Sequence, residues 1–326
     1  MEIPLLKEKI LFAYEKIIAA KSILLVTHEH PDGDGLSSLC ALAVFLDCLG
    51  KNQTLFCADP AQDFFSFLPQ IHKITAQKNF NFSEFDLIIV LDCGCLARTK
   101  LTEEIKNRGQ NQFVIEFDHH PKTDDYSDLE IRALKSSTAE LLYYFFSNNN
   151  LEINKNIANC LLTGILTDTG NLLFGAVTKE TIKISSAMLL HGATFPKITK
   201  YTLQNKSLAA LKAWGKILDN LKLNKKYNLA FSVLTYEDIQ ALKKEFGNKD
   251  LLDVATDILN NVDGVKAVVF LREEEKGKIR GSLRTKEAKV DVSRLASFLN
   301  GGGHPKASAF RLPGSIMKTK TGWKII

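Results

Sequence analysis

The chain lacks several features that would place it outside the ordinary globular proteins. No apolar run approaches the roughly eighteen residues that a membrane-spanning helix needs. The first residues, MEIPLLKEKILFAYEKI, interleave charged and apolar residues at helical spacing, which a secretory signal does not do. There is also no internal repeat and no low-complexity tract. We therefore expect a cytoplasmic protein with no membrane partner.

Paired cysteines at metal-binding spacing are also missing. The six cysteines are scattered along the chain and form no CxxC pair. This usage favours reduced, mostly buried thiols in a reducing compartment. Cys93 and Cys95 flank one glycine, and the alternative is a soft-metal site there. Such a site would need a second thiol pair, which the sequence does not supply.

The charge of the chain is unevenly distributed. Of its 326 residues, 45% are hydrophobic and 24% are charged, and this length favours two domains over one. Residues 1–196 contain 17 Lys or Arg and 24 Asp or Glu, whereas residues 197–326 contain 25 and 13. An acidic half suits hard cations and a basic half suits a polyanionic ligand. The alternative for the basic half is a solvated, lysine-rich surface.

Strand and helix patterns alternate over the first part of the chain. Strands are expected at 22–27, 53–59, 85–92 and 113–120, and helices at about 4–20, 36–49, 99–108, 138–148, 154–166 and 179–191. This rhythm predicts an α/β fold with a doubly wound, mainly parallel sheet.

The pattern changes in the second part of the chain. The basic segment 196–222 is expected to form a linking helix. Beyond it we expect a strand at 227–234, a helix at 237–247, a hairpin over 265–285 and a helix at 292–299. The segment GGGHPKASAF, residues 301–310, is expected to be a Gly-rich loop that opens another helix, with backbone N–H groups that could bind an anion. These patterns predict a smaller α/β domain with a mixed sheet.

Side chains that bind metals gather at the ends of the predicted elements of the first domain. The candidates are His28, Asp32, Asp34, Asp92, His119, His120 and Asp168. Because parallel strands end at one edge of their sheet, these side chains should converge. Carboxylate and imidazole ligands without thiols suit Mn²⁺, and Zn²⁺ or Fe²⁺ less well. Seven ligands are too many for one ion and predict a pair of metals that share a carboxylate. For each residue alone, the alternative is a purely structural role.

Taken together, these motifs resemble a known family. HEHPDGD, the strand that ends at Asp92, the Asp118-His119-His120 triplet and TDTG at 167–170 are similar to the four motifs of the DHH-superfamily phosphoesterases. SLRT at 282–285 and GGGH at 301–304 resemble the associated DHHA1 domain. The arrangement looks most like the NrnA-type group, whose members degrade very short RNAs and remove the 3′-phosphate from 3′-phosphoadenosine 5′-phosphate (pAp). The resemblance implies a DHH catalytic domain over 1–195, a linker helix over 196–222 and a DHHA1 substrate-binding domain over 223–326.

The resemblance also implies a role for each candidate in the first domain. Two Mn²⁺ ions would be bound, the first by His28, Asp32 and Asp92 and the second by Asp34, Asp92, His119 and Asp168. Asp92 would bridge the ions, and a water activated between them would attack the phosphate. His120 would contact the scissile phosphate, and Asp118 would orient an imidazole. Arg98 would contact phosphate, with a surface ion pair as its alternative.

For the second domain, the resemblance implies that Arg284, Gly301, Gly302, Gly303 and His304 bind the far end of the substrate. Short single-stranded RNA or nucleotides are then the expected substrates, and a homodimer is left open. The alternatives are cleavage of cyclic or linear dinucleotides and a non-catalytic nucleotide-binding regulator. The sequence does not rank pAp, short RNA and cyclic dinucleotides as substrates.

Overall fold

The structure is a computed structural model that describes residues 3–173, 176–204, 207–246, 262–319 and 322–326. The chain divides into two compact units, residues 1–205 and 206–326. Within the described ranges, no helix is both long and apolar enough to span a membrane. The predicted boundaries of the catalytic, linker and substrate-binding segments stay predictions.

The first unit is built on a six-stranded sheet in which every pair of neighbouring strands is parallel. The strands are β1 (Ser22–Val26), β2 (Asn52–Phe56), β3 (Ile74–Thr75), β4 (Leu87–Leu91), β5 (Phe113–Asp118) and β6 (Leu129–Arg132), in the order β3-β2-β1-β4-β5-β6. The α/β fold with a parallel sheet is thus confirmed, although β3 and β6 were not predicted. The order reverses between β1 and β4, which is where open parallel sheets form their ligand crevice.

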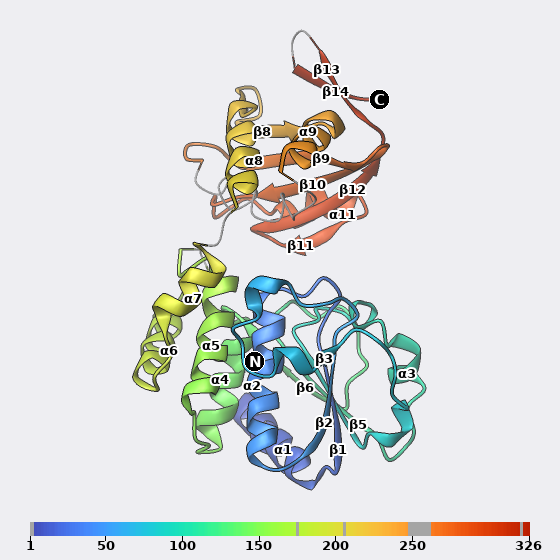
Figure 1. The fold of residues 1–326 in the computed structure, drawn as a ribbon, viewed down its shortest axis with the longest axis vertical. Coiled ribbons are helices and arrows are strands. Elements are labelled where there is room, and N and C mark those ends of the chain that lie inside the picture. The colour runs from blue at the N-terminus through green and yellow to red at the C-terminus, as the bar shows by residue number, and fades with distance from the viewer. Residues whose placement is uncertain (1–2, 174–175, 205–206, 247–261, 320–321) are drawn as a thin grey trace. The chain divides into compact units, whose positions relative to one another are not determined.

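Strand side chains alternate between two apolar layers. Ile23 and Leu25 of β1 face one core, and Leu24 and Val26 face the other. Helices other than α3 cover the first core as Figure 1 shows, and the 3₁₀ turns that contain Phe65 and Ile71 pack against the same core. Helix α3 and the turns that contain Phe82 and Leu96 lie on the opposite face. The helices are α1 (Ile3–Ala19), α2 (Gly33–Cys48), α3 (Thr102–Lys106), α4 (Thr138–Asn148), α5 (Lys155–Asp168), α6 (Lys179–Leu190) and α7 (Phe195–Thr202), and the turns are η1 (Asp63–Phe65), η2 (Ile71–Lys73), η3 (Phe82–Glu84) and η4 (Leu96–Thr99). Burial on both faces explains why β4 is apolar throughout and why β1 is apolar after Ser22.

The second unit contains a mixed six-stranded sheet, as predicted. Its order is β11-β12-β10-β9-β8-β7, and only the pairing of β8 with β9 is parallel among the described strands. The strands are β7 (Lys222–Asn224), β8 (Leu229–Leu234), β9 (Ala267–Glu275), β10 (Lys278–Arg284), β11 (Gly302–His304) and β12 (Ala307–Pro313), and β13 (Ile316–Thr319) pairs with β14 (Gly322–Ile325). The helices are α8 (Leu208–Asp219), α9 (Tyr236–Phe246) and α11 (Val292–Phe298). The segment predicted as one linking helix forms α7 and α8 instead, with residues 203–207 between them.

The Gly-rich segment does not open a helix, and that prediction was wrong. Residues 301–310 form β11, a tight turn and the start of β12, and the two strands pair antiparallel. In β12 the side chains of Ser308 and Phe310 are buried between more exposed neighbours, which is the two-residue period of a strand. A Cβ on Gly301 would lie 2.1 Å from Ala309 O, so this glycine lets two backbones approach closely. The predicted anion cradle at a helix start is therefore absent from the described part of this segment.

Candidate metal centre

The turn after β1 brings His28 and Asp32 to the carboxyl edge of the sheet. Asp32 is the N-cap of α2, and its Oδ1 accepts hydrogen bonds from the N–H groups of Asp34 (3.1 Å) and Gly35 (3.0 Å). His28 is buried, and its Nε2 lies 3.6 Å from Asp32 Oδ1. Gly33 is required here because a Cβ would lie 2.4 Å from Thr167 Oγ1. The turn between β1 and α2 thus begins the helix and directs the side chains of His28 and Asp32 toward each other.

Asp92 follows β4 and faces two groups of ligands. Its Oδ2 lies 3.9 Å from His28 Nε2, and its Oδ1 lies 3.4 Å from His119 Nε2. The residue is buried and has a φ of 62°, in the left-handed region that non-glycine residues seldom adopt. One carboxylate with its two oxygens directed to different imidazoles has the geometry of a bridging ligand.

A second group of ligands lies on the other side of Asp92. Asp34, His119 and Asp168 offer ligand atoms within 4.8 Å of one another, as do His28, Asp32 and Asp92 in the first group. His119 Nε2 is 3.6 Å from Asp168 Oδ2 at the end of α5. The six side chains predicted as metal ligands therefore lie close together, and the assignment of each to one of two ions stays a prediction.

The two histidines are oriented for metal binding. His28 Nδ1 is 2.7 Å from Glu29 O, and His119 Nδ1 is 3.2 Å from Lys135 O. With Nδ1 bonded to the carbonyl of Lys135, His119 directs Nε2 toward Asp92 and Asp168. The tautomer of His28 depends on which partner bonds its Nδ1, because Glu29 O can only accept and the guanidinium of Arg98, also at 2.7 Å, can only donate. Among the described residues, the buried His28 Nε2 has no hydrogen-bond partner. An unpaired buried nitrogen beside two carboxylates fits a site that a cation completes.

The carboxylates of this centre carry an electrostatic cost that a cation would remove. Burial, together with the negative charges of Asp34 and Asp32, raises the pKa of Asp92 well above its ordinary value. Burial also raises the pKa of Asp34, and it raises the pKa of Asp168 to about 8 although His119 opposes that change. Burial disfavours the charge of His119, but Asp168 and Asp34 outweigh it and raise the pKa of that imidazole. Divalent cations favour the ionised carboxylates and so fit this donor set.

The DHH triplet is supported by a buried network that the sequence did not reveal. Asp118 Oδ1 accepts a hydrogen bond from His120 Nδ1 at 2.9 Å. Burial raises the pKa of Asp118, but the bond from His120 outweighs it and the pKa falls to about 2. Arg132 of β6 donates to His120 O (2.6 Å) and to Glu116 Oε1 (2.5 Å). Glu116 interrupts the apolar strand β5, and that buried acid was the available signal for this network.

Arg98 lies beside the first group of ligands. Its Nη2 is 2.7 Å from His28 Nδ1, and its Nη1 donates to Cys93 O at 3.2 Å. The structure thus places Arg98 at the centre rather than in a surface ion pair. Two further groups offer ligand atoms close to one another. One is Asp92 with His119 and His120, which overlaps the groups above. The other is Glu29, His30 and Asp59, whose side chains are more exposed and of which Glu29 already pairs with Lys100 at 2.8 Å.

The residues predicted to bind the far end of the substrate lie in the second unit. Arg284 ends β10 and is half-buried, and its Nη1 donates to Leu283 O. Gly302, Gly303 and the backbone of His304 form β11, while the His304 side chain lies outside the described structure.

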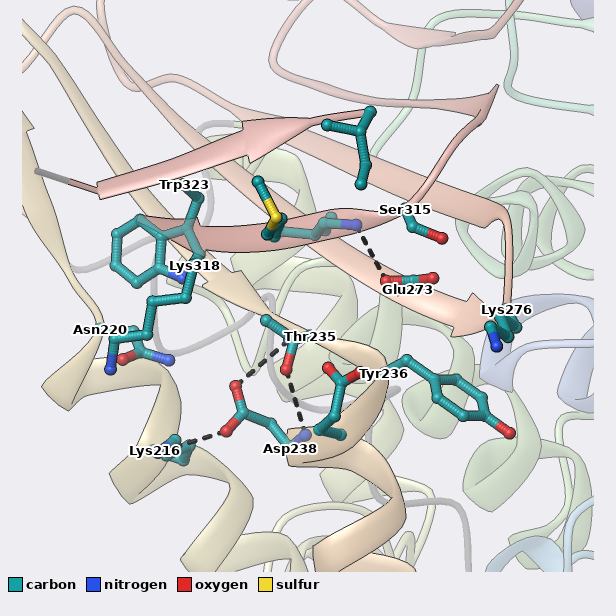
Figure 2. Close-up of a pocket in the computed structure, with 14 residues that line it drawn as sticks. Lys216, Asn220, Thr235, Tyr236, Asp238, Glu273, Lys276, Ser315, Lys318 and Trp323 are labelled. Atoms are coloured by element: carbon teal, nitrogen blue, oxygen red, sulfur yellow. Dashed lines mark hydrogen bonds and ion pairs between the residues drawn. The ribbon is translucent and has the colours of Figure 1, made fainter. Parts of the chain in front are cut away.

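The second unit also contains a pocket of about 500 Å³ beside β13 and α9 (Figure 2). Two of its carboxylates, those of Asp238 and Glu273, are engaged within the protein. Asp238 pairs with Lys216 at 3.3 Å and accepts from the N–H of Thr235, and Glu273 accepts from the N–H groups of Gly277 and Ile316. Because these groups already have partners, the pocket does not compete with the metal centre as the candidate active site.

Comparisons with known proteins agree with this geometry. Residues 22–165 match the DHH family, N-terminal domain, and residues 226–320 match the DHHA1 domain. The chain is 26% identical over 291 residues to the "Bifunctional oligoribonuclease and PAP phosphatase NrnA" of Bacillus subtilis, covering 88% of each protein. It is 28% identical over 293 residues to the protein of that name from Thermus thermophilus, covering 90% of this chain and 84% of the relative.

The chain is also similar to a solved structure over most of its length. The crystal structure of an exopolyphosphatase-related protein from Bacteroides fragilis superposes with a TM-score of 0.85 at 28% identity, covering 95% of this chain and 92% of that one. The two matched domains together span most of the chain, in the order that the motifs predicted. The chain belongs to the DHH/DHHA1 family of phosphoesterases and is a phosphoester hydrolase.

Proposed function

We propose that the protein is a manganese-dependent phosphoesterase that hydrolyses short oligoribonucleotides and also removes the 3′-phosphate of pAp. The observation that carries this proposal is the position of Asp92. Its two oxygens face separate groups of His and Asp ligands, which is the arrangement expected of a two-metal site for attack on phosphorus.

The donor set supports manganese. Carboxylate oxygens and imidazole nitrogens without a thiolate suit Mn²⁺ in proteins. Cys93, although next to Asp92, is buried, and burial raises the pKa of its thiol well above the ordinary value, so it would stay protonated. When bound, the two ions would supply positive charge to the phosphate and lower the pKa of an attacking water.

The remaining residues of the centre would bind and orient the substrate. Asp118 holds His120 through Nδ1 at 2.9 Å, and the imidazole oriented in this way would contact the scissile phosphate. The guanidinium of Arg98 would add a charged donor for a phosphate oxygen. In the second unit, Arg284 and His304 would bind a further part of the substrate. The excess of Lys and Arg in residues 197–326 suits a polyanion there.

The choice of substrate rests on the relatives. Proteins named as oligoribonucleases and PAP phosphatases cover nearly the whole chain at 26–28% identity. The test is one assay with Mn²⁺ in which pAp, RNAs of two to five nucleotides, a 24-nucleotide RNA, pyrophosphate and cyclic di-AMP are compared. We expect kcat/KM to be highest for the short RNAs, with measurable turnover of pAp. Faster turnover of the 24-nucleotide RNA or of cyclic di-AMP would contradict the proposal.

The control for this assay is Asp92→Asn. Asparagine is tolerated in the left-handed region better than alanine, so the variant keeps the backbone while it loses the bridging charge. We expect loss of activity on every substrate with an unchanged far-UV circular dichroism spectrum. Retained turnover would contradict the shared-ligand assignment.

A further inference from the structure

We propose that Thr138, at the start of α4, is a positioning residue that fixes the carboxylates of both metal groups at once. The inference rests on the proposed function, because it assigns to Thr138 an effect on metals bound by Asp34 and Asp92. No motif in the sequence singled out this residue.

Thr138 contacts one carboxylate from each group. Its Oγ1 donates to Asp92 Oδ1 at 2.8 Å, and its backbone N–H donates to Asp34 Oδ2 at 2.6 Å. The next N–H along α4, that of Ala139, donates to Asp34 Oδ1 at 3.0 Å. All four residues are buried, so no bulk water competes for these bonds. One residue therefore sets the rotation of two carboxylates that come from different elements.

The bond to Asp92 decides which oxygen faces which group. Oδ1, which accepts from Thr138, is the oxygen nearest His119, and Oδ2 is left to face His28. Without the hydroxyl, rotation about the Cβ–Cγ bond of Asp92 would no longer be fixed from this side. At Asp34 the N–H groups of Thr138 and Ala139 each bond one oxygen, and so hold the carboxylate in one orientation.

The start of α4 is itself held rigidly. Ser137 is the N-cap and accepts from the N–H of Glu140 at 3.1 Å. The carboxylate of Glu140 then accepts from Ser136 Oγ (2.5 Å) and from Thr181 Oγ1 of α6 (3.0 Å). Because the turn is tied both to its own helix and to α6, Thr138 has a fixed position from which to orient the ligands.

The test compares Thr138→Val with Thr138→Ser. Valine keeps the branched shape and the backbone N–H but removes the hydroxyl donor, whereas serine keeps the donor. Mn²⁺ binding to metal-stripped full-length protein would be measured by titration calorimetry and by the electron paramagnetic resonance signal of free Mn²⁺. We expect Thr138→Val to weaken Mn²⁺ binding by about 10–100-fold, the usual effect of losing a partner behind a ligand. Thr138→Ser should stay within about threefold of the wild type, and kcat should fall in the valine variant more than KM rises.

Thr163→Val is the matched control. Thr163 is also buried, but its hydroxyl donates to Asn159 O within α5 at 2.7 Å. We expect that variant to bind Mn²⁺ as the wild type does. Should Thr138→Val not fold, Thr138→Ala lacks the same donor without adding a methyl group against Asp92 and decides the question.

Unchanged Mn²⁺ affinity in a folded variant without the hydroxyl would overturn the inference, as would equal losses in the serine and valine variants. A wild-type protein that binds no Mn²⁺ would instead overturn the proposed two-metal function, so the two failures are distinguishable.

Discussion

Replacing Gly164 by alanine should destabilise the first unit, although alanine is the better helix former. Gly164 lies inside α5, where the usual gain from Gly to Ala is about 0.8–1 kcal/mol. Here a Cβ would lie only 2.6 Å from each of three atoms, which are Ala139 Cβ, Asp34 Oδ1 and Ser37 Oγ. The helices α2, α4 and α5 would have to move apart to admit one methyl group.

The expected cost follows from these contacts. Overpacking of a well-filled core costs about 1–3 kcal/mol, and three contacts this short favour the upper part of that range. After subtraction of the helix gain, the free energy of unfolding should fall by about 1–2 kcal/mol. Because one of the three atoms is the carboxylate oxygen of Asp34, Mn²⁺ binding should weaken as well.

Gly215 in α8 provides the matched comparison. It is also a helical glycine, but a Cβ there would meet no atom within 4 Å. Gly215→Ala should therefore stabilise its unit by about 0.5–1 kcal/mol and leave Mn²⁺ binding unchanged. Urea unfolding of the metal-stripped proteins, followed by circular dichroism, measures the first effect, and calorimetry measures the second. If Gly164→Ala were as stable as the wild type, the close packing of α5 on the metal centre would be refuted.

Three further outcomes follow from the buried network and core. The pKa of Asp168 is raised to about 8 in the folded protein, so its contribution to stability is present below the ordinary value of 3.8 and is lost as pH rises through 8. Because Mn²⁺ replaces that proton, the rise in Tm on adding Mn²⁺ should be larger at pH 8.5 than at pH 6, and a pH-independent rise in thermal-shift scans would refute this. Arg132→Met should lower the free energy of unfolding by about 3–5 kcal/mol in urea titrations, since it leaves the buried Glu116 without its cationic partner and with only the hydroxyl donors of Tyr126 and Ser127; a loss below about 1 kcal/mol would show that the pair is not needed. Phe145→Ala should also cost about 3–5 kcal/mol, because Phe145 is buried among Phe45, Phe117 and Phe146, and a smaller m-value would show that the native core had loosened instead.

The convergence of the candidate ligands could be predicted because it follows from the topology of the sheet. His28, Asp92 and His119 each come after an apolar strand, and parallel strands end at the same edge of a sheet. Thr138 and Arg132 lie behind those ligands and could not be predicted in this way. Their contacts depend on where α4 and β6 pack, and β6 is a four-residue strand too short and polar to show a clear period.

The helix predicted after the Gly-rich segment was wrong for a different reason, because its local preference was misleading. Ala307, Ser308 and Ala309 carry little intrinsic preference against a helix, and glycines before them resemble a helix start. In the structure, pairing with β10 decides the outcome, since Arg284, Leu283 and Ser282 match these three residues in register. Tertiary pairing of this kind is invisible to local preference.

The left-handed backbone of Asp92 also limits how the sequence can drift at this position. Most replacements would face a steric penalty of roughly 1–2 kcal/mol before any effect of their side chain is felt. Glycine and asparagine escape that penalty, but neither carries the negative charge that a bridging ligand needs. The replacements that fit this backbone conformation therefore lack the charge that a bridging ligand needs. Burial of this carboxylate beside other acids costs stability, so the proposed function and the stability of the fold make opposite demands on residue 92.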